Sequence, residues 1–117
     1  MNSSGLNEHH VPLKDDTFLG TADARPLRLL AEYLEPLHHF RREGIHDTVV
    51  FFGSARLMPD GPMGRYYEEA RTLARRVTEW SRGLGGGRQR FVVCSGGGPG
   101  IMEAANRGAA EAKGKTI

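Results

Sequence analysis

A glycine-rich segment, Ser95-Gly96-Gly97-Gly98-Pro99-Gly100, constrains the fold of this chain more than any other part of its sequence. The apolar run Phe91–Cys94 before it has the β-branched and aromatic residues of a short buried strand. Residues 101–113 after it are rich in alanine and lack proline, which favours a helix. Consecutive glycines let the backbone adopt positive φ and approach a ligand closely, and a helix N-terminus supplies free N–H groups. The pattern predicts a loop that binds an anion, usually a phosphate. The alternative is a tight strand-to-helix turn that binds no ligand.

Two better-known phosphate-binding motifs do not fit this segment. In the dinucleotide fingerprint G-x-G-x-x-G, a frame that begins at Gly96 requires glycine where Ile101 stands, and a frame that begins at Gly98 meets Glu103. NAD or FAD is therefore not predicted, and no other cofactor is predicted. Gly114-Lys115-Thr116 matches the end of a P-loop, but it follows a predicted helix, whereas a P-loop follows a strand. We attribute this match to chance.

The residues before the first predicted strand divide into a polar tail and a helix. Residues 1–22 are polar with few apolar anchors, so we predict a disordered tail. Pro26 suits the first position of a helix, which we expect over residues 26–43. Pro36 is expected to kink or split this helix. The helix carries an apolar stripe of Leu27, Leu30, Leu34, Leu37 and Phe40. We expect the four leucines to be buried against the sheet or a second subunit.

The rest of the chain alternates apolar runs and helical segments. A continuous apolar run at residues 48–52 indicates a strand buried in a parallel sheet. A helix is expected at about 65–82, before the strand at 91–94, and residues 115–117 have the character of a third strand's opening. The helix expected at about 65–82 has apolar residues at helical spacing: Tyr67, Ala70, Leu73, Ala74, Val77 and Trp80. The order helix, strand, helix, strand, helix predicts an α/β fold, the start of a doubly wound parallel sheet with an N-terminal helix.

The predicted sheet is incomplete, with two strands and the start of a third. A parallel sheet of this size is too small to bury both of its faces, and 117 residues form one domain at most. We therefore expect residues 23–117 to be the N-terminal part of a nucleotide-binding domain in a larger protein. A swapped or oligomeric small domain is the alternative.

The exit of the first predicted strand, Gly53-Ser54-Ala55-Arg56, is a second candidate ligand contact. Ligands bind outside the carboxyl ends of parallel strands, and adjacent strand exits face one crevice. If the two strands are neighbours, Ser54 and the loop at 96–100 line the same pocket. Ser54 offers a hydroxyl and a backbone N–H, and Arg56 is either a charged fork for phosphate or a solvent-exposed charge. Glu103, in the first helical turn, either favours the helix dipole or contacts ribose hydroxyls.

Charge and composition bear on partners and location. The 16 basic and 14 acidic side chains give a net charge of +2, which does not indicate nucleic acid or a membrane surface as a partner. No apolar stretch has the length of a membrane span or a signal-peptide core. The single cysteine, Cys94, excludes an internal disulfide and is expected to pack within its strand. His9 and His10 have no third ligand at a suitable spacing, so no metal site is predicted. The sequence thus predicts a cytoplasmic protein.

Two segments of this chain resemble the motifs of a known family. They are residues 49–56, Val-Val-Phe-Phe-Gly-Ser-Ala-Arg, and residues 95–109, Ser-Gly-Gly-Gly-Pro-Gly-Ile-Met-Glu-Ala-Ala-Asn-Arg-Gly-Ala. The sequence resembles the Lonely Guy family over residues 44–117 and, more loosely, over the preceding helix. Members of this family are cytokinin riboside 5'-monophosphate phosphoribohydrolases, often mislabelled lysine decarboxylases. The resemblance implies a Rossmann-like fold, a homodimer, and hydrolysis of a nucleoside 5'-monophosphate such as AMP to free base and ribose 5-phosphate.

The resemblance covers only part of the family's site. We expect these residues to bind the substrate: Gly53, Ser54, Ala55, Arg56, Gly96, Gly97, Gly98, Pro99, Gly100 and Glu103. The family's other signature, Pro-Gly-Gly-x-Gly-Thr-x-x-Glu, and the catalytic arginine upstream of it have no counterpart here and are expected after Ile117. No residue is therefore assigned a catalytic role. The alternative function is a truncated, non-catalytic nucleotide-binding module.

Overall fold

A computed structural model describes residues 10–117, and the chain forms two compact units, residues 1–42 and 43–117. The first nine residues of the predicted tail, including His9, lie outside the described residues. From Pro12 onward the structure differs from the predicted disorder. A short 3-10 helix, η1 (Pro12–Lys14), is followed by the single helical turn α1 (Asp16–Leu19). The Asp15 carboxylate accepts the Phe18 N–H at 3.0 Å, and this side-chain cap gives the polar segment its local structure.

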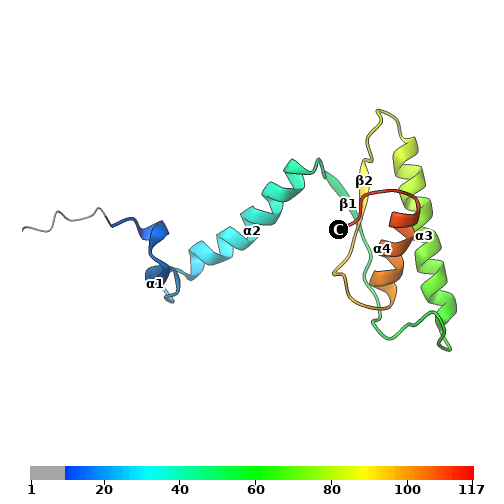
Figure 1. Ribbon diagram of the computed structural model, residues 1–117, viewed down its shortest axis with the longest axis horizontal. Coiled ribbons are helices and arrows are strands. Elements are labelled where there is room, and N and C mark those ends of the chain that lie inside the picture. The colour runs from blue at the N-terminus through cyan, green and yellow to red at the C-terminus, as the bar shows by residue number, and fades with distance from the viewer. Residues whose placement is uncertain (1–9) are drawn as a thin grey trace, which may run out of the picture. The chain divides into compact units, whose positions relative to one another are not determined.

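The longest helix of the first unit is α2 (Arg25–Arg42), where the sequence predicts a helix over residues 26–43 (Figure 1). Of the two effects expected of Pro36, a kink or a split, the split is not found, because the helix continues through this residue. Proline removes only its own N–H from the helical ladder, and good helix formers flank it on both sides. Within the first unit Leu27, Leu30 and Leu34 are exposed. Their burial against the sheet or a second subunit stays a prediction.

The second unit contains a parallel sheet, as predicted. Strand β1 (Asp47–Val50) pairs with β2 (Phe91–Cys94), in a register that runs from Asp47 opposite Phe91 to Val50 opposite Cys94. On the other side of β2, Thr116 forms a parallel bridge with Val93. The Ile117 N–H donates to the Val93 carbonyl at 3.0 Å, so β2 lies between β1 and the expected opening of a third strand.

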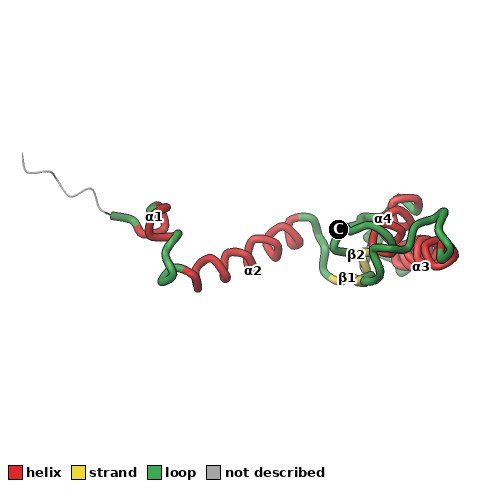
Figure 2. The backbone as a smooth tube through the Cα atoms, turned by 90° about the horizontal axis from the view of Figure 1, so that it is seen from below, coloured by secondary structure: helices red, strands yellow, loops and turns green. Residues whose placement is uncertain are grey.

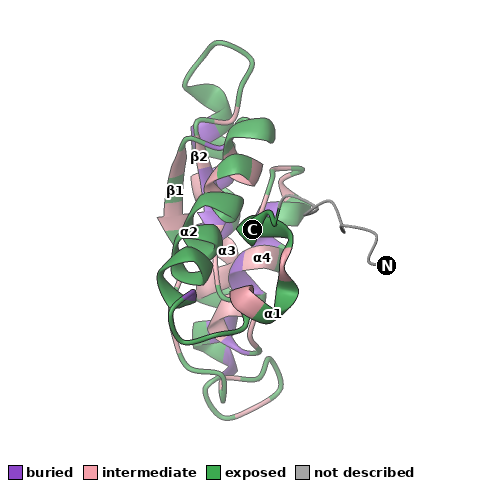
Figure 3. Cartoon of the chain, turned by 90° about the vertical axis from the view of Figure 1, so that its left-hand side faces the viewer, coloured by how far each residue is buried: buried purple, intermediate pink, exposed green. Residues whose placement is uncertain are grey.

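Two helices pack together on one side of this sheet (Figures 1 and 2). They are α3 (Gly64–Gly83) and α4 (Ile101–Glu111), and both also contact β2. The core between them consists of small and branched side chains: Ala74, Val93, Ala105 and Ala109, with Phe51 and Val77 partly buried against them. Figure 3 shows the buried segments gathered where these elements meet. The expected α/β class is confirmed at this level.

A glycine lets α3 and α4 approach closely. A Cβ atom on Gly108 would lie 2.0 Å from the Arg71 carbonyl oxygen, which is far inside van der Waals contact. The apolar residues expected on α3 separate into two groups as a result of this packing. Tyr67 and Ala74 are buried, whereas Leu73 and Trp80 are exposed.

Candidate functional site

The glycine loop leaves the carboxyl end of β2 and enters α4, as the sequence predicts. Gly97 and Gly100 have φ values of +71° and +77°, a left-handed conformation that other residues rarely adopt. The Gly97 N–H donates to Ser95 Oγ at 3.1 Å, which fixes the first turn of the loop. The backbone conformation at these two positions therefore requires glycine whether or not a ligand binds.

The exits of the two strands are in direct contact. The Ile101 N–H donates to the Ser54 carbonyl at 3.1 Å, and a Cβ atom on Gly100 would lie 2.2 Å from that same oxygen. In the opposite direction, a Cβ atom on Gly53 would lie 2.7 Å from Ile101 Cγ2. The backbones at residues 53–55 and 100–101 thus touch at positions where only hydrogen fits as a side chain. The expectation that the two strand exits are neighbours is met by this contact.

The same contact reduces the anion-binding capacity of α4. Its first amide, Ile101 N–H, is already bonded to Ser54. The next two amides, of Met102 and Glu103, have no acceptor among the described residues. Two N–H groups at the positive end of the helix dipole therefore remain for a ligand beside the glycine loop.

Six of the ten candidate residues line two hollows of the surface, and Gly53, Ala55, Gly96 and Gly100 line neither of them. One hollow, of about 450 Å³, is lined by Gly97, Gly98, Pro99, Glu103, Asn106, Arg107, Ala110 and Thr116. The other, of about 340 Å³, is lined by Ser54, Arg56, Leu57, Met58, Gly61, Pro62 and Met63. Ser54 and the glycine loop were expected to line one pocket, and of these two hollows each lines a different one. The two backbones meet too closely at Gly53 and Gly100 to leave space for a ligand between them.

A buried tyrosine, which the sequence does not single out for function, organises the first hollow, which we call the glycine-loop hollow. Tyr67 of α3 is 1 % exposed, and its hydroxyl donates to Glu103 Oε1 at 2.9 Å. The same hydroxyl accepts from Arg107 Nη1 at 3.0 Å, and Arg107 lies 3.6 Å from the Glu103 carboxylate. The hydrogen bond with Tyr67 raises the pKa of the Arg107 guanidinium. Glu103 is thus held in place on the first turn of α4, where the helix dipole also favours a carboxylate.

Neither the Tyr67–Glu103 bond nor the role of Arg107 has a local signal in the sequence. Tyr67 and Glu103 are 36 residues apart, and only the packing of α3 on α4 brings them together. A second side-chain bond, from Thr116 Oγ1 to Asn106 Oδ1 at 2.7 Å, links α4 to the third-strand segment at the edge of the same hollow.

The residues of the β1 exit are less constrained. Ser54 Oγ accepts the Arg56 N–H at 3.1 Å, and the side chain of Arg56 is exposed. Ala55 is also exposed. Arg56 therefore lines the second hollow with an exposed side chain, and both of its predicted roles stay predictions.

Neither a cluster of metal-ligating side chains nor a membrane-spanning helix is found among residues 10–117. No three His, Cys, Asp or Glu side chains among residues 10–117 are placed to hold a metal ion together. Within those residues, no helix combines the length and the apolar character needed to cross a bilayer. Comparison of the chain with protein-family models gives no match, and comparison with curated proteins gives no significant match.

Proposed function

We propose that this chain binds the ribose-phosphate part of a nucleoside 5'-monophosphate in the glycine-loop hollow. The observation that carries the proposal is the position of Gly97 and Gly98 beside the N-terminus of α4, where two amides are free to bind an anion. The left-handed glycine loop exposes backbone rather than side chains at this place. The hollow lies outside the carboxyl end of a parallel strand, where ligands of α/β sheets bind.

The nearby side chains suit the sugar of such a ligand. A phosphate would accept from the amides of Met102 and Glu103, and the Glu103 carboxylate would accept from ribose hydroxyls. We further propose that the sheet belongs to a Rossmann-like doubly wound fold of a cytoplasmic homodimer, as the resemblance to the Lonely Guy family implies.

The reaction that we propose at the level of this family is hydrolysis of the N-glycosidic bond, which releases the base and ribose 5-phosphate. Such a reaction passes through an oxocarbenium-like state, which a carboxylate near the ribose stabilises. Glu103 is the carboxylate that lines the hollow, but its bonds to Tyr67 and Arg107 account for its position without catalysis. No described residue is therefore assigned a catalytic role.

A non-catalytic nucleotide-binding module is the second candidate. The observation that favours it is the same engagement of Glu103, which leaves the hollow suited to hold a ligand rather than to transform it. Chromatographic measurement of adenine released from AMP separates the two candidates. Release above the rate in buffer supports hydrolysis, and binding of AMP without release supports the module.

Binding itself is tested by calorimetric titration of AMP into two matched variants. Gly97 and Gly87 have nearly equal φ values, +71° and +68°, and a Cβ atom at either position meets nothing within 4 Å. Valine at either position therefore imposes the same backbone strain, but only Gly97 lines the hollow. Gly98 is a poorer choice, because its Cβ atom would lie 2.8 Å from Met102 Cε.

We expect Gly97→Val to reduce AMP affinity roughly tenfold or more, equivalent to about 1.4 kcal/mol. Gly87→Val should bind AMP as the unaltered chain does. Equal affinities of the two variants for AMP would contradict the proposed site, and absence of AMP binding by the unaltered chain would contradict the proposed function.

A further inference from the structure

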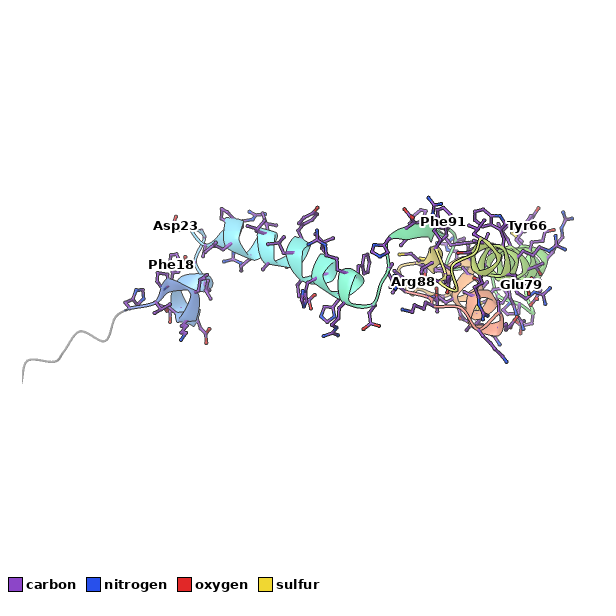
Figure 4. The ribbon with its side chains drawn as sticks, turned by 90° about the horizontal axis from the view of Figure 1, so that it is seen from above. Phe18, Asp23, Tyr66, Glu79, Arg88 and Phe91 are labelled. Atoms are coloured by element: carbon purple, nitrogen blue, oxygen red, sulfur yellow. The ribbon has the colours of Figure 1, made fainter. Side chains whose placement is uncertain are left out.

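Helix α3 and its two flanking residues carry a second apolar face that their own unit covers only in part. Val77 is partly buried against the core, and the Trp80 ring stacks on Phe91 of β2 with 5.3 Å between the ring centroids. The residues of this face, which we call the seam, follow steps of three and four: Met63, Tyr66, Ala70, Leu73, Val77, Trp80 and Leu84. This is the heptad spacing of helices that pair with another helix. Leu73 and Trp80 are 54 % and 55 % exposed, and Figure 4 shows Tyr66 projecting outward from α3. Exposed apolar rows of this length mark interaction surfaces.

The two flanks of the seam differ. On one flank Tyr67, Ala74 and Ser81 are buried in the core of their own unit. On the other flank stand two exposed charges one heptad apart, Glu69 and Arg76. Glu69 pairs with Arg65 at 2.9 Å, whereas Arg76 has no acidic partner among the described residues. Both charges line a hollow of about 420 Å³ beside Leu73.

We propose that the seam is an interface on which a second copy of this chain packs its own α3 in antiparallel orientation. In that orientation Glu69 of one protomer faces Arg76 of its partner, and the reverse pair forms on the other side of the two-fold axis. The small Ala70 of one copy lies opposite Leu73 of the other, so the hollow beside Leu73 is filled.

The charges select this orientation and this occupant. A parallel pairing would direct Glu69 and Arg76 toward the flank formed by Tyr67, Ala74 and Ser81, which faces its own core and offers no charge. In the antiparallel pairing the surface is complementary to itself, because Glu69 of each protomer faces Arg76 of the other. The inference does not depend on nucleotide binding, and it names the face on which the dimer forms.

The test is the mass of the full chain in solution, measured by sedimentation equilibrium. We expect a dimer at micromolar concentration. Leu73→Lys should raise the dissociation constant more than roughly tenfold, because it buries a charge at the centre of the seam. Leu29→Lys is the matched control, since Leu29 of α2 is equally exposed, at 58 %, and lies outside the seam. This control should leave the dissociation constant unchanged.

Charge reversal tests the orientation. Glu69→Arg places two arginines against each other across the interface, and Arg76→Glu places two glutamates there, so each variant alone should dissociate roughly tenfold more readily. An equimolar mixture of the two variants restores both opposite-charge pairs, and native mass spectrometry should show a heterodimer at the stability of the unaltered dimer. Circular dichroism confirms that each variant is folded, which is expected because all three altered positions on α3 are exposed.

Four results would overturn the proposal. The first is a monomer at about 100 µM, a concentration far above the dissociation constants of stable dimers. The second is a dimer that Leu73→Lys does not weaken, and the third is a dimer that Leu29→Lys weakens as much as Leu73→Lys does, which would place the contact on α2. The fourth is a mixture of the two charge variants that forms no heterodimer, which would exclude the antiparallel pairing.

Discussion

The buried hydroxyl of Tyr67 allows a quantitative prediction about how α3 and α4 are held together. Tyr67→Phe removes one oxygen atom and leaves the ring packed as before. The hydroxyl bonds to two charged side chains, Glu103 and Arg107, at 2.9 and 3.0 Å. A bond to a charged partner contributes about 1.5–3 kcal/mol when both groups are buried.

The expected loss is smaller than the sum of two such bonds. The side chains of Glu103 and Arg107 are 47 % and 51 % exposed, so both regain water when the hydroxyl is removed. They also lie 3.6 Å from each other and keep that ion pair. We therefore expect Tyr67→Phe to lower the free energy of unfolding by about 1 to 2 kcal/mol. For a unit of this size the loss corresponds to several degrees in Tm.

Urea unfolding followed by circular dichroism measures this loss, and Tyr66→Phe is the control. Tyr66 is the neighbouring residue on the exposed face of α3, and loss of its hydroxyl should change the stability by less than about 0.5 kcal/mol. Equal effects of the two variants would refute the reasoning, as would a gain in stability for Tyr67→Phe.

Three further predictions concern the second unit. Gly108→Ala should cost about 2 kcal/mol or more in urea unfolding, because its Cβ atom meets backbone, whereas Gly83→Ala, which meets nothing within 4 Å, should be neutral or slightly stabilising. Glu111→Gln should lower Tm at neutral pH, since a hydrogen bond with an arginine of α3 lowers the pKa of Glu111. The difference from the unaltered chain should vanish as the pH falls through that lowered pKa, because the carboxylate's contribution is present only above it. Gln89→Ala should accelerate hydrogen exchange at the Ile117 amide, because the Gln89 side chain bonds to the N–H and C=O of the residue that opens the third strand, and constant exchange would contradict this.

The strand, loop and helix units follow from local sequence, and the structure places them within a few residues of the prediction. The second strand has its predicted bounds, Phe91–Cys94, because β-branched residues and flanking polar ones define it locally. The first strand was expected to reach Phe52, but β1 ends at Val50, and the last backbone bond to β2 is from the Phe51 N–H to the Cys94 carbonyl at 2.8 Å. Phe52 is 89 % exposed, so its apolar character did not reflect burial.

The site depends on contacts between distant residues, and these are less predictable. The stripe expected on α3 was wider than one face of a helix, and sequence spacing does not tell which half α4 covers. For the same reason the Tyr67–Glu103 bond was not foreseen. A shared pocket of Ser54 and the glycine loop was expected because the two strands were expected to be adjacent. The strands are adjacent. The separation into two hollows comes from how closely the backbones meet, which residue types alone do not specify.

We expect the close contact between the two strand exits to limit how these loops vary among related sequences. Gly53 leaves space for Ile101, and Gly100 leaves space for the backbone at Ser54. Neither glycine tolerates a larger residue unless the opposite loop moves, so we expect substitutions at positions 53 and 100–101 to occur together. A glycine loop transplanted into another scaffold would likewise need residues 53–55 with it. We therefore expect the two loops to be inherited as a pair, although Gly100 follows Gly53 by 47 positions in the sequence.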